Sequence, residues 1–391
     1  MINQKIKESI TNNSEELTVL RRKLHSEPEL SFEEFKTTAF VCEYLDELGI
    51  PYRKTEPTGV IAEIQAVPGG KTVALRADMD ALPVQQLNTH VPYASKVEGK
   101  MHACGHDAHT SMLLIAAKAL NDVKEQLPGN VRFLFQPAEE AAAGAKAIVA
   151  QGAMDGVDNV FGIHIWSQMP TNKVACSPGP SFAAADIVKV RFKGKGGHAA
   201  MPEACIDAAI VASSFVMNVQ TVVSRTIDPQ SPAVLTIGKM VVGTRFNVIA
   251  ENAEIEGTVR TFHPETRNHI EKSITQYAES IASTYGATAE VEYIRGTDTV
   301  VNEEESAQLV QKVATEAFGS DSVYDEKPTM GAEDFSAYLT KASGSFALVG
   351  SGNPQKDTEW AHHHGNFDID EDALVTGAEL YAQYAWAYLN K

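Results

Sequence analysis

The chain has 391 residues, of which 43% are hydrophobic and 21% are charged, and its formal net charge is −18. This length exceeds what one hydrophobic core usually holds together, so we expect two domains. The negative charge disfavours nucleic-acid partners. The sequence has no run of about 18 apolar residues, so no membrane span is expected. A polar N-terminal stretch without a secretory pattern and four scattered cysteines are typical of a cytoplasmic protein.

The first part of the chain alternates helices with short apolar strands. In chain order we expect a helix over 4–24, a helix over 32–50 that ends near Gly49, a strand over 72–80, a helix over 110–123 capped by Thr110 or Ser111, a strand over 130–140, a helix over 141–154 and a strand over 160–166. This alternation predicts an α/β fold with a largely parallel sheet. Functional sites of such sheets collect at the carboxyl ends of the strands.

The middle of the chain follows a different pattern. Strands are expected over 184–200, which breaks at glycines, and over 233–243, 246–262 and 287–296, with helices over 205–223 and 267–286. This is the composition of a small α+β domain with its own core. We therefore expect it to be inserted, over 184–296, into a catalytic domain formed by 1–183 and 297–391.

The stretch MHACGHDAH, residues 101–109, contains several side chains that bind metals. Cys104 and His106 are two residues apart, so both can face one site from a loop. A thiolate and an imidazole are good ligands for zinc-like ions. A Cys–His nucleophile pair and a merely polar loop are the alternatives that this stretch leaves open.

Further candidate groups are distributed along the chain. They are Asp78 and Asp80 after one strand, Glu139 and Glu140 after another, His164 within an apolar strand, and the run His362, His363 and His364. Each has a simpler reading when taken alone, as a solvated turn, an acidic helix start or a core histidine. Together they supply a thiolate, imidazoles and carboxylates. This set fits a hydrolytic site with two ions about 3.5–4 Å apart that polarise a carbonyl and activate a water molecule.

Eight separated stretches, in order from about residue 20 to the C-terminus, resemble the M20 metallopeptidase family. They are ALRADMDALPV, MHACGHDAHTSMLL, FLFQPAEE, GIHIW, GKGGHAAMPE, NVIAENAEIEGTVRTF, MGAEDFS and HHHGNFDIDEDAL. The resemblance is strongest to the amidohydrolase branch, which includes N-acyl amino acid deacylases, hippurate hydrolases and hydrolases of auxin–amino acid conjugates. It implies a mixed-sheet α/β catalytic domain that binds two metal ions and carries an inserted α+β lid.

The resemblance implies two divalent ions, zinc in the first place, with manganese, cobalt or nickel as alternatives. The implied ligands are Cys104, which resembles the ligand that bridges both metals, His106, Glu140, His164 and His363. The family pattern H-x-P-x-[FY] selects His363, four residues before Phe367, although Gly365 stands where the family has proline. Glu139 resembles the general base. Asp80 resembles the acid that orients a metal-binding imidazole.

The inserted domain resembles the lid of the family, which also forms a homodimer interface. His198 resembles a histidine that stabilises the oxyanion in the partner's site. Asn247 and Arg260 match positions that bind the substrate carboxylate, and Gly331 matches a loop that lines the pocket.

The implied activity is hydrolysis of small N-acyl amino acids to a carboxylic acid and a free amino acid. An aminopeptidase or dipeptidase is the alternative enzyme, but it needs a site for a free α-amino group that the sequence does not display. A non-catalytic metal-binding protein is the third reading. Its expected mark would be loss of the base or of ligands, and all of them are present.

Overall fold

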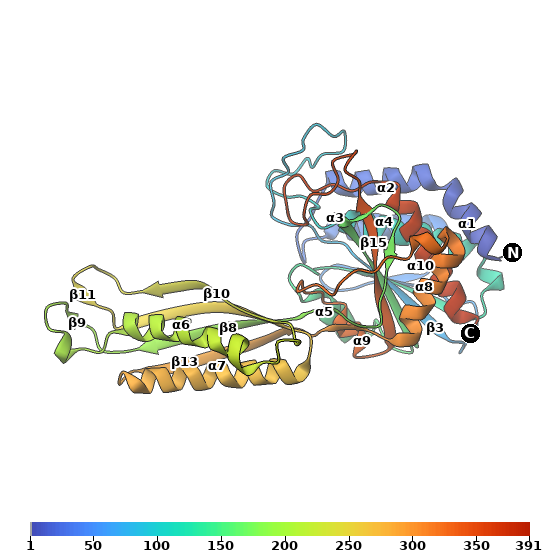
Figure 1. Ribbon diagram of the computed structural model, residues 1–391. Coiled ribbons are helices and arrows are strands. Elements are labelled where there is room, and N and C mark those ends of the chain that lie inside the picture. The colour runs from blue at the N-terminus through green and yellow to red at the C-terminus, as the bar shows by residue number, and fades with distance from the viewer. Residues whose placement is uncertain (1) are drawn as a thin grey trace. The chain divides into compact units, whose positions relative to one another are not determined.

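The computed structural model describes residues 2–391, which divide into two compact units (Figure 1). The first unit comprises Met1–Ser181, Val301–Lys327 and Asp334–Lys391, and the second comprises Phe182–Val300 and Pro328–Glu333. The expected insert spans 184–296, and no pattern in the sequence marks 328–333 as part of it. Within the described residues, no helix combines the length and apolar character needed to cross a membrane.

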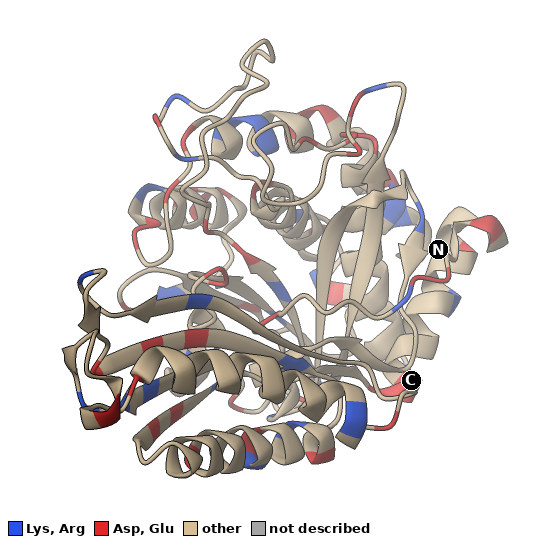
Figure 2. Cartoon of the chain, turned by 60° about the vertical axis from the view of Figure 1, so that its left-hand side comes forward, with Lys and Arg blue, Asp and Glu red and all other residues tan. Residues whose placement is uncertain are grey.

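A seven-stranded mixed sheet forms the centre of the first unit. Its strands, in spatial order, are β1 (Tyr52–Lys54), β2 (Val60–Ile64), β4 (Asn130–Gln136), β3 (Thr72–Asp78), β5 (Asn159–Pro170), β15 (Ser343–Gly352) and β6 (Val174–Ala175). The four strands β4, β3, β5 and β15 run parallel, and the outer strands join antiparallel. β5 and β15 carry no Lys, Arg, Asp or Glu, as expected for strands covered on both faces (Figure 2).

Helices complete the core of the first unit, some packed against the sheet and others against neighbouring helices. They are α1 (Ile2–Asn12), α2 (Ser14–Ser26), α3 (Phe35–Leu48), α4 (His106–Asp122), α5 (Gly144–Ala150), α8 (Glu304–Phe318), α9 (Ser336–Leu339) and α10 (Ala373–Leu389), with short 3₁₀ turns at Lys124–Gln126 and Ser320–Ser322. α4 and α10 contact each other and the sheet, and both are buried over most of their length. A helix that is apolar on nearly every side requires such a location.

The expected helix over 4–24 is wrong, because the structure has two helices that meet at Asn13. The Asn13 side chain donates a hydrogen bond to the Ser9 carbonyl at 2.7 Å, which satisfies an acceptor at the end of α1. The C-terminal end of α3 agrees with the prediction, since Gly49 adopts the left-handed conformation with φ 65°.

The expected cap of the next helix is also wrong, because α4 begins four residues earlier than Thr110. Thr110 and Ser111 are buried within the helix. The Thr110 hydroxyl donates to the Asp78 carbonyl at 2.7 Å, and the Ser111 hydroxyl donates to the Asp107 carbonyl. The early start places His106 at the first position of α4.

The second unit is an antiparallel sheet with two helices. Its strands, in spatial order, are β10 (Ala233–Val242), β12 (Asn252–Thr261), β8 (Ala184–Lys193) and β13 (Thr288–Thr297), and its helices are α6 (Ala208–Thr226) and α7 (Pro264–Thr284). Both helices contact the sheet and each other around a separate apolar core. Smaller elements of this unit are the pair β9 (Gly197–His198) and β11 (Val248–Ile249) and a 3₁₀ turn at Pro202–Ala204. The pair β7 (Gly179–Phe182) and β14 (Val300–Asn302) lies where the chain passes from one unit to the other.

Candidate metal centre

The predicted ligands come from four stretches of the first unit that lie far apart in the sequence. These are the loop before α4 with Cys104 and the first helical residue His106, the turn after β4 with Glu140, strand β5 with His164, and the loop 353–372 with His363, which follows His362. Because β4, β3, β5 and β15 are parallel, their carboxyl ends share one edge of the sheet. This arrangement brings together Cys104 and His362, which are 258 positions apart.

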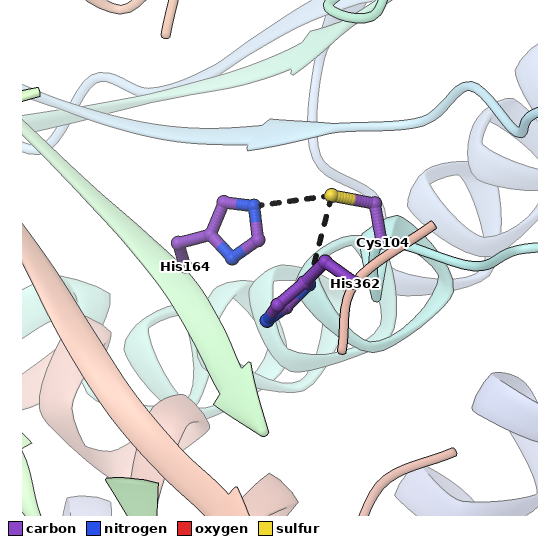
Figure 3. Close-up of side chains that lie close together, drawn as sticks. All are labelled: Cys104, His164 and His362. Carbon is purple, nitrogen blue, oxygen red and sulfur yellow. Dashed lines mark hydrogen bonds between the residues drawn. The ribbon is translucent and has the colours of Figure 1, made fainter. Parts of the chain in front are cut away.

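Two groups of candidate ligand atoms share the sulfur of Cys104. In the first group, Cys104, His164 and His362 offer atoms that all lie within 4.8 Å of one another, and Figure 3 shows both imidazoles beside the sulfur. Cys104 Sγ is 3.5 Å from His164 Nε2 and 3.8 Å from His362 Nδ1. In the second group, Cys104 meets His106 and Glu140 within the same limit. A thiolate common to both groups is suited to bridge two ions.

The orientation of His164 makes Nε2 the ring nitrogen that could bind a metal ion. His164 Nδ1 lies 2.6 Å from the Ile165 carbonyl oxygen, which can only accept, so Nδ1 carries the proton. The lone pair is then on Nε2, on the side of Cys104. Burial, with the neighbouring His109 and His362, lowers the pKa of His164 well below its ordinary value. The ring is therefore neutral, as a metal ligand must be.

The histidine run places two imidazoles near the cluster in different ways. His362 is partly buried, and its Nε2 accepts a weak hydrogen bond from the Ser167 N–H at 3.4 Å. Burial, and then the neighbouring His363, lower the pKa of His362 to about 3, so the ring is neutral. Because Nε2 accepts from the Ser167 N–H, the single ring proton is on Nδ1, toward Cys104. His363 is half-exposed, and its Nε2 lies 3.4 Å from Glu140 Oε1. His362 is thus oriented as a donor to the sulfur, and His363 as a companion of Glu140.

Buried polar atoms without hydrogen-bond partners show that the cluster fits divalent ions. Among the described residues, neither His106 Nε2 nor Glu140 Oε1 has a hydrogen-bond partner, although both atoms are buried. The two atoms are 3.9 Å apart, and Glu139 Oε2 is 4.0 Å from the same nitrogen. Polar atoms in such positions are costly unless a ligand completes their coordination. The combination of sulfur, nitrogen and carboxylate oxygen suits zinc and related ions.

Asp80 holds the turn after β4 and one imidazole at the same time. Its Oδ1 accepts from the Glu139 N–H at 3.1 Å and lies 3.2 Å from His106 Nδ1. Its Oδ2 accepts from the Glu140 N–H at 3.0 Å and from the Ser31 hydroxyl at 2.7 Å. Although burial acts in the opposite direction, His106 and Ser31 hold the pKa of Asp80 below its usual value. The ionised carboxylate thereby directs His106 Nε2 into the cluster.

A third close group, of Asp78, His106 and His109, belongs to the scaffold. His109 Nδ1 lies 2.6 Å from Asp78 Oδ1, while its Nε2 accepts from the Ile165 N–H at 2.8 Å. Both nitrogens of His109 are therefore engaged, and neither has a lone pair for a metal. The simple reading of Asp78 as a solvated turn residue is wrong: it is fully buried and accepts from Arg76 Nη1 at 2.7 Å.

The supporting residues around Arg76 give no signal in the sequence. Burial acts to raise the pKa of Asp78, but the Arg76 guanidinium together with His106 and His109 holds it well below the usual range. Arg76 Nη2 also donates to Asp334 at 3.0 Å, and Asp334 accepts from the side chain of Gln136. Burial raises the pKa of Asp334 to about 6 in spite of Arg76. These contacts join residues up to 258 positions apart, so only the folded chain displays them.

Four further predicted residues lie in the second unit. His198 is exposed in β9, and Asn247 is exposed immediately before β11. Because Val248 pairs with His198, these two predicted residues are close neighbours. Arg260 is half-buried in β12, and Gly331 is exposed in the segment 328–333. Within this unit the structure brings His198 and Asn247 together, and Arg260 and Gly331 lie on separate elements.

Comparison with known proteins shows extensive similarity. The sequence pattern of peptidase family M20/M25/M40 matches residues 74–387. The chain is 43% identical over 368 residues to an N-acetyl-L-cysteine deacetylase of Bacillus subtilis (strain 168), a match that covers 94% of this chain and 86% of the relative. It is 38% identical over 393 residues to thermostable carboxypeptidase 1 of Saccharolobus solfataricus, covering 99% of each.

A solved structure has the same fold. The YXEP protein of Bacillus subtilis, described as a dinuclear metal-binding peptidase from the M20 family, superimposes with a TM-score of 0.86 at 35% identity. The match covers 97% of this chain and 99% of that one. The likeness therefore extends over both units, and it includes a relative that binds two metal ions.

Proposed function

The chain belongs to peptidase family M20/M25/M40, and from this premise we propose that it hydrolyses the amide bond of N-acyl amino acids. The products are a carboxylic acid and a free amino acid. The observation that carries the proposal is the cluster around Cys104, with Glu139 beside it, in a chain that is 43% identical to a deacetylase of N-acetyl-L-cysteine.

We propose that two divalent ions, zinc in the first place, are held at this cluster. Cys104 would bridge them, and His106, Glu140, His164 and His363 would complete the two coordination spheres. When bound, such ions polarise the amide carbonyl and lower the pKa of a water molecule. His362 then serves as a hydrogen-bond donor to the bridging sulfur, which favours the thiolate form of Cys104.

Glu139 is the general base in this proposal. Its carboxylate faces the cluster, 4.0 Å from His106 Nε2, and its backbone N–H is fixed by Asp80. Glu139 accepts a proton from the attacking water molecule and later returns it to the nitrogen of the leaving amine. Asp80 keeps the turn and His106 in place throughout, so that neither step requires the site to reorganise.

The second unit supplies substrate recognition in this proposal, as the sequence resemblance implies. His198 stabilises the oxyanion, Asn247 and Arg260 bind the substrate carboxylate, and Gly331 lines the pocket. A guanidinium is suited to this task because it can donate to both carboxylate oxygens. We further propose that this unit is a lid that forms a homodimer, which light scattering would test, and that the enzyme works in the cytoplasm, where its four free cysteines stay reduced.

The test is amine release by protein that has been stripped with a chelator and reloaded with zinc, manganese, cobalt or nickel. The substrates are N-acetyl, N-benzoyl and N-indoleacetyl amino acids, peptides with a free C-terminus, and free dipeptides. Metal-dependent cleavage of the acyl substrates supports the proposal. Absence of cleavage with every metal, in protein that binds two ions, would refute it.

A carboxypeptidase is a second candidate, because one relative carries that name. Both reactions cleave an amide bond next to an amino acid with a free carboxylate, so they differ only in the group on the acyl side. Faster release from peptides than from N-acyl amino acids in the same panel would select the carboxypeptidase. Faster cleavage of free dipeptides than of longer peptides and N-acyl amino acids would instead indicate a dipeptidase.

A further inference from the structure

Glu34 is a fully buried carboxylate in the first unit, immediately before α3. Its Oε1 accepts from the backbone N–H of Ala138 at 2.8 Å, and its Oε2 accepts from the Thr58 hydroxyl at 2.6 Å. Neither partner is a cation, and the nearby charge of Asp80 has the same sign. Burial therefore raises the pKa of Glu34. Such a group is expensive to bury, so its retention calls for a role.

The partner of Glu34 begins the turn that carries the proposed base and a proposed ligand. Three successive N–H groups of this turn donate to two buried carboxylates, Ala138 to Glu34 and then Glu139 and Glu140 to Asp80. Ala138 adopts a left-handed conformation with φ 52°, which a residue with a side chain rarely adopts without support from its surroundings. The Ala138 carbonyl accepts in turn from the Gly144 N–H at 3.0 Å.

The segment that carries Glu34 reaches the site at a second point. Ser31 donates to Asp80 Oδ2 at 2.7 Å, and the Glu29 carbonyl accepts from the Ala81 N–H at 2.8 Å. Residues 29–34 are thus bonded to both sides of the site, at the stretch after β3 and at the turn after β4. A change in this segment is transmitted to two functional groups through three hydrogen bonds.

We propose that Glu34 is a positioning residue, which fixes the direction of the Glu139 and Glu140 side chains through its hydrogen bond to the Ala138 amide. This inference rests on the proposed function for the role of Glu139 as base. For Glu140 it requires only that the cluster binds a metal ion. The hydrogen bonds of the Glu34 carboxylate go to Ala138 and Thr58, neither of which is a proposed ligand.

The experiment compares Glu34→Ala and Glu34→Gln in the full chain. A glutamine keeps an oxygen acceptor for the Ala138 N–H, and its amide can donate to the Thr58 hydroxyl, whereas an alanine removes both bonds. Zinc affinity is measured by competition with a chromophoric chelator. The values of kcat and KM are measured with an N-acetyl amino acid, well below the unfolding temperature of each variant. Glu379→Ala is the control, since Glu379 is a buried glutamate of the same unit in α10.

The expected result is a loss of about 10- to 100-fold in zinc affinity and in kcat for Glu34→Ala, the range typical of residues that orient metal ligands. KM should change little, and Glu34→Gln and Glu379→Ala should stay close to the wild type. Wild-type zinc affinity in Glu34→Ala would overturn the proposal. So would an equal loss in the Glu379→Ala control, or a loss in Glu34→Gln as large as in Glu34→Ala.

A substitute variant and a readout independent of activity allow a conclusion even if Glu34→Ala does not fold or the wild type cleaves no acyl substrate. If Glu34→Ala does not yield folded protein, Glu34→Asp replaces it, because the shorter side chain cannot reach both Ala138 and Thr58. Unchanged zinc affinity in that variant would also refute the role. If the wild type cleaves no acyl substrate, the proposed reaction fails, but the zinc affinities still decide whether Glu34 positions Glu140.

Discussion

Replacing Asp80 by asparagine tests whether one carboxylate organises the whole centre. The side chain keeps its size, but only one of its two polar atoms remains an acceptor. If the oxygen stays with His106 and the Glu139 N–H, the new amide faces the Glu140 N–H, and two donors then oppose each other. The Ser31 hydroxyl can rotate to accept, whereas the backbone N–H of Glu140 cannot.

The size of the effect follows from this lost contact. A hydrogen bond to an ionised acceptor contributes about 1.5–3 kcal/mol, which corresponds to roughly 10- to 100-fold in an equilibrium constant. We therefore expect Asp80→Asn to bind zinc about 10- to 100-fold more weakly in a chelator competition. At saturating zinc its kcat should also be lower, because the turn with Glu139 is less well fixed. Zinc binding by this variant as tight as that of the wild type would show that Asp80 does not organise the centre in this way.

Glu139→Gln should retain both ions by elemental analysis and lose about 10²- to 10⁴-fold in kcat, the usual contribution of a general base; full turnover would exclude Glu139 from that role. His363→Ala should lower the number of bound ions, whereas His362→Ala should leave the number unchanged and weaken affinity; the reverse result would exchange the two assignments. Glu379→Gln should raise the melting temperature at neutral pH, because burial raises the pKa of Glu379. The folded state therefore binds this proton more tightly than the unfolded state does, and stability falls as the pH rises through that pKa. The gain should vanish at a pH below the unfolded value of 4.5, and a lower melting temperature at neutral pH would contradict this reasoning.

The sequence was sufficient to predict the parts of the site that follow parallel strands. Glu139 and Glu140 follow the apolar strand β4, and parallel pairing brings positions after such strands to one edge of the sheet. His164 lies within an apolar strand, where a core histidine is the simpler interpretation, so only the family resemblance selected it as a ligand. The alternating pattern likewise predicted the α/β class. The break at Asn13 was missed because apolar residues keep helical spacing across it. The early start of α4 was missed because Gly105, and no capping side chain, precedes it.

The supporting residues could not be predicted, because their local sequence suggests other roles. Glu34 lies in a charged stretch before a helix, where an exposed carboxylate is the ordinary expectation, yet it is fully buried. His109 has the spacing of a metal ligand, and only its two hydrogen bonds assign it to the scaffold. The histidine run provides three identical side chains, so nothing in their chemistry distinguishes His362 from His363 before the chain is folded.

In the proposed metal centre, the sharing of one sulfur between both ligand groups concentrates the sensitivity to oxidation in a single atom. Damage to His164 or Glu140 removes a ligand from one group only, whereas oxidation of Cys104 to a sulfinic acid removes a ligand from both at once. A population exposed to oxidant would therefore contain intact and inactive molecules, with few that retain one working half of the site. Oxidative loss of function in this protein would be all-or-none for each molecule, and graded only across the population.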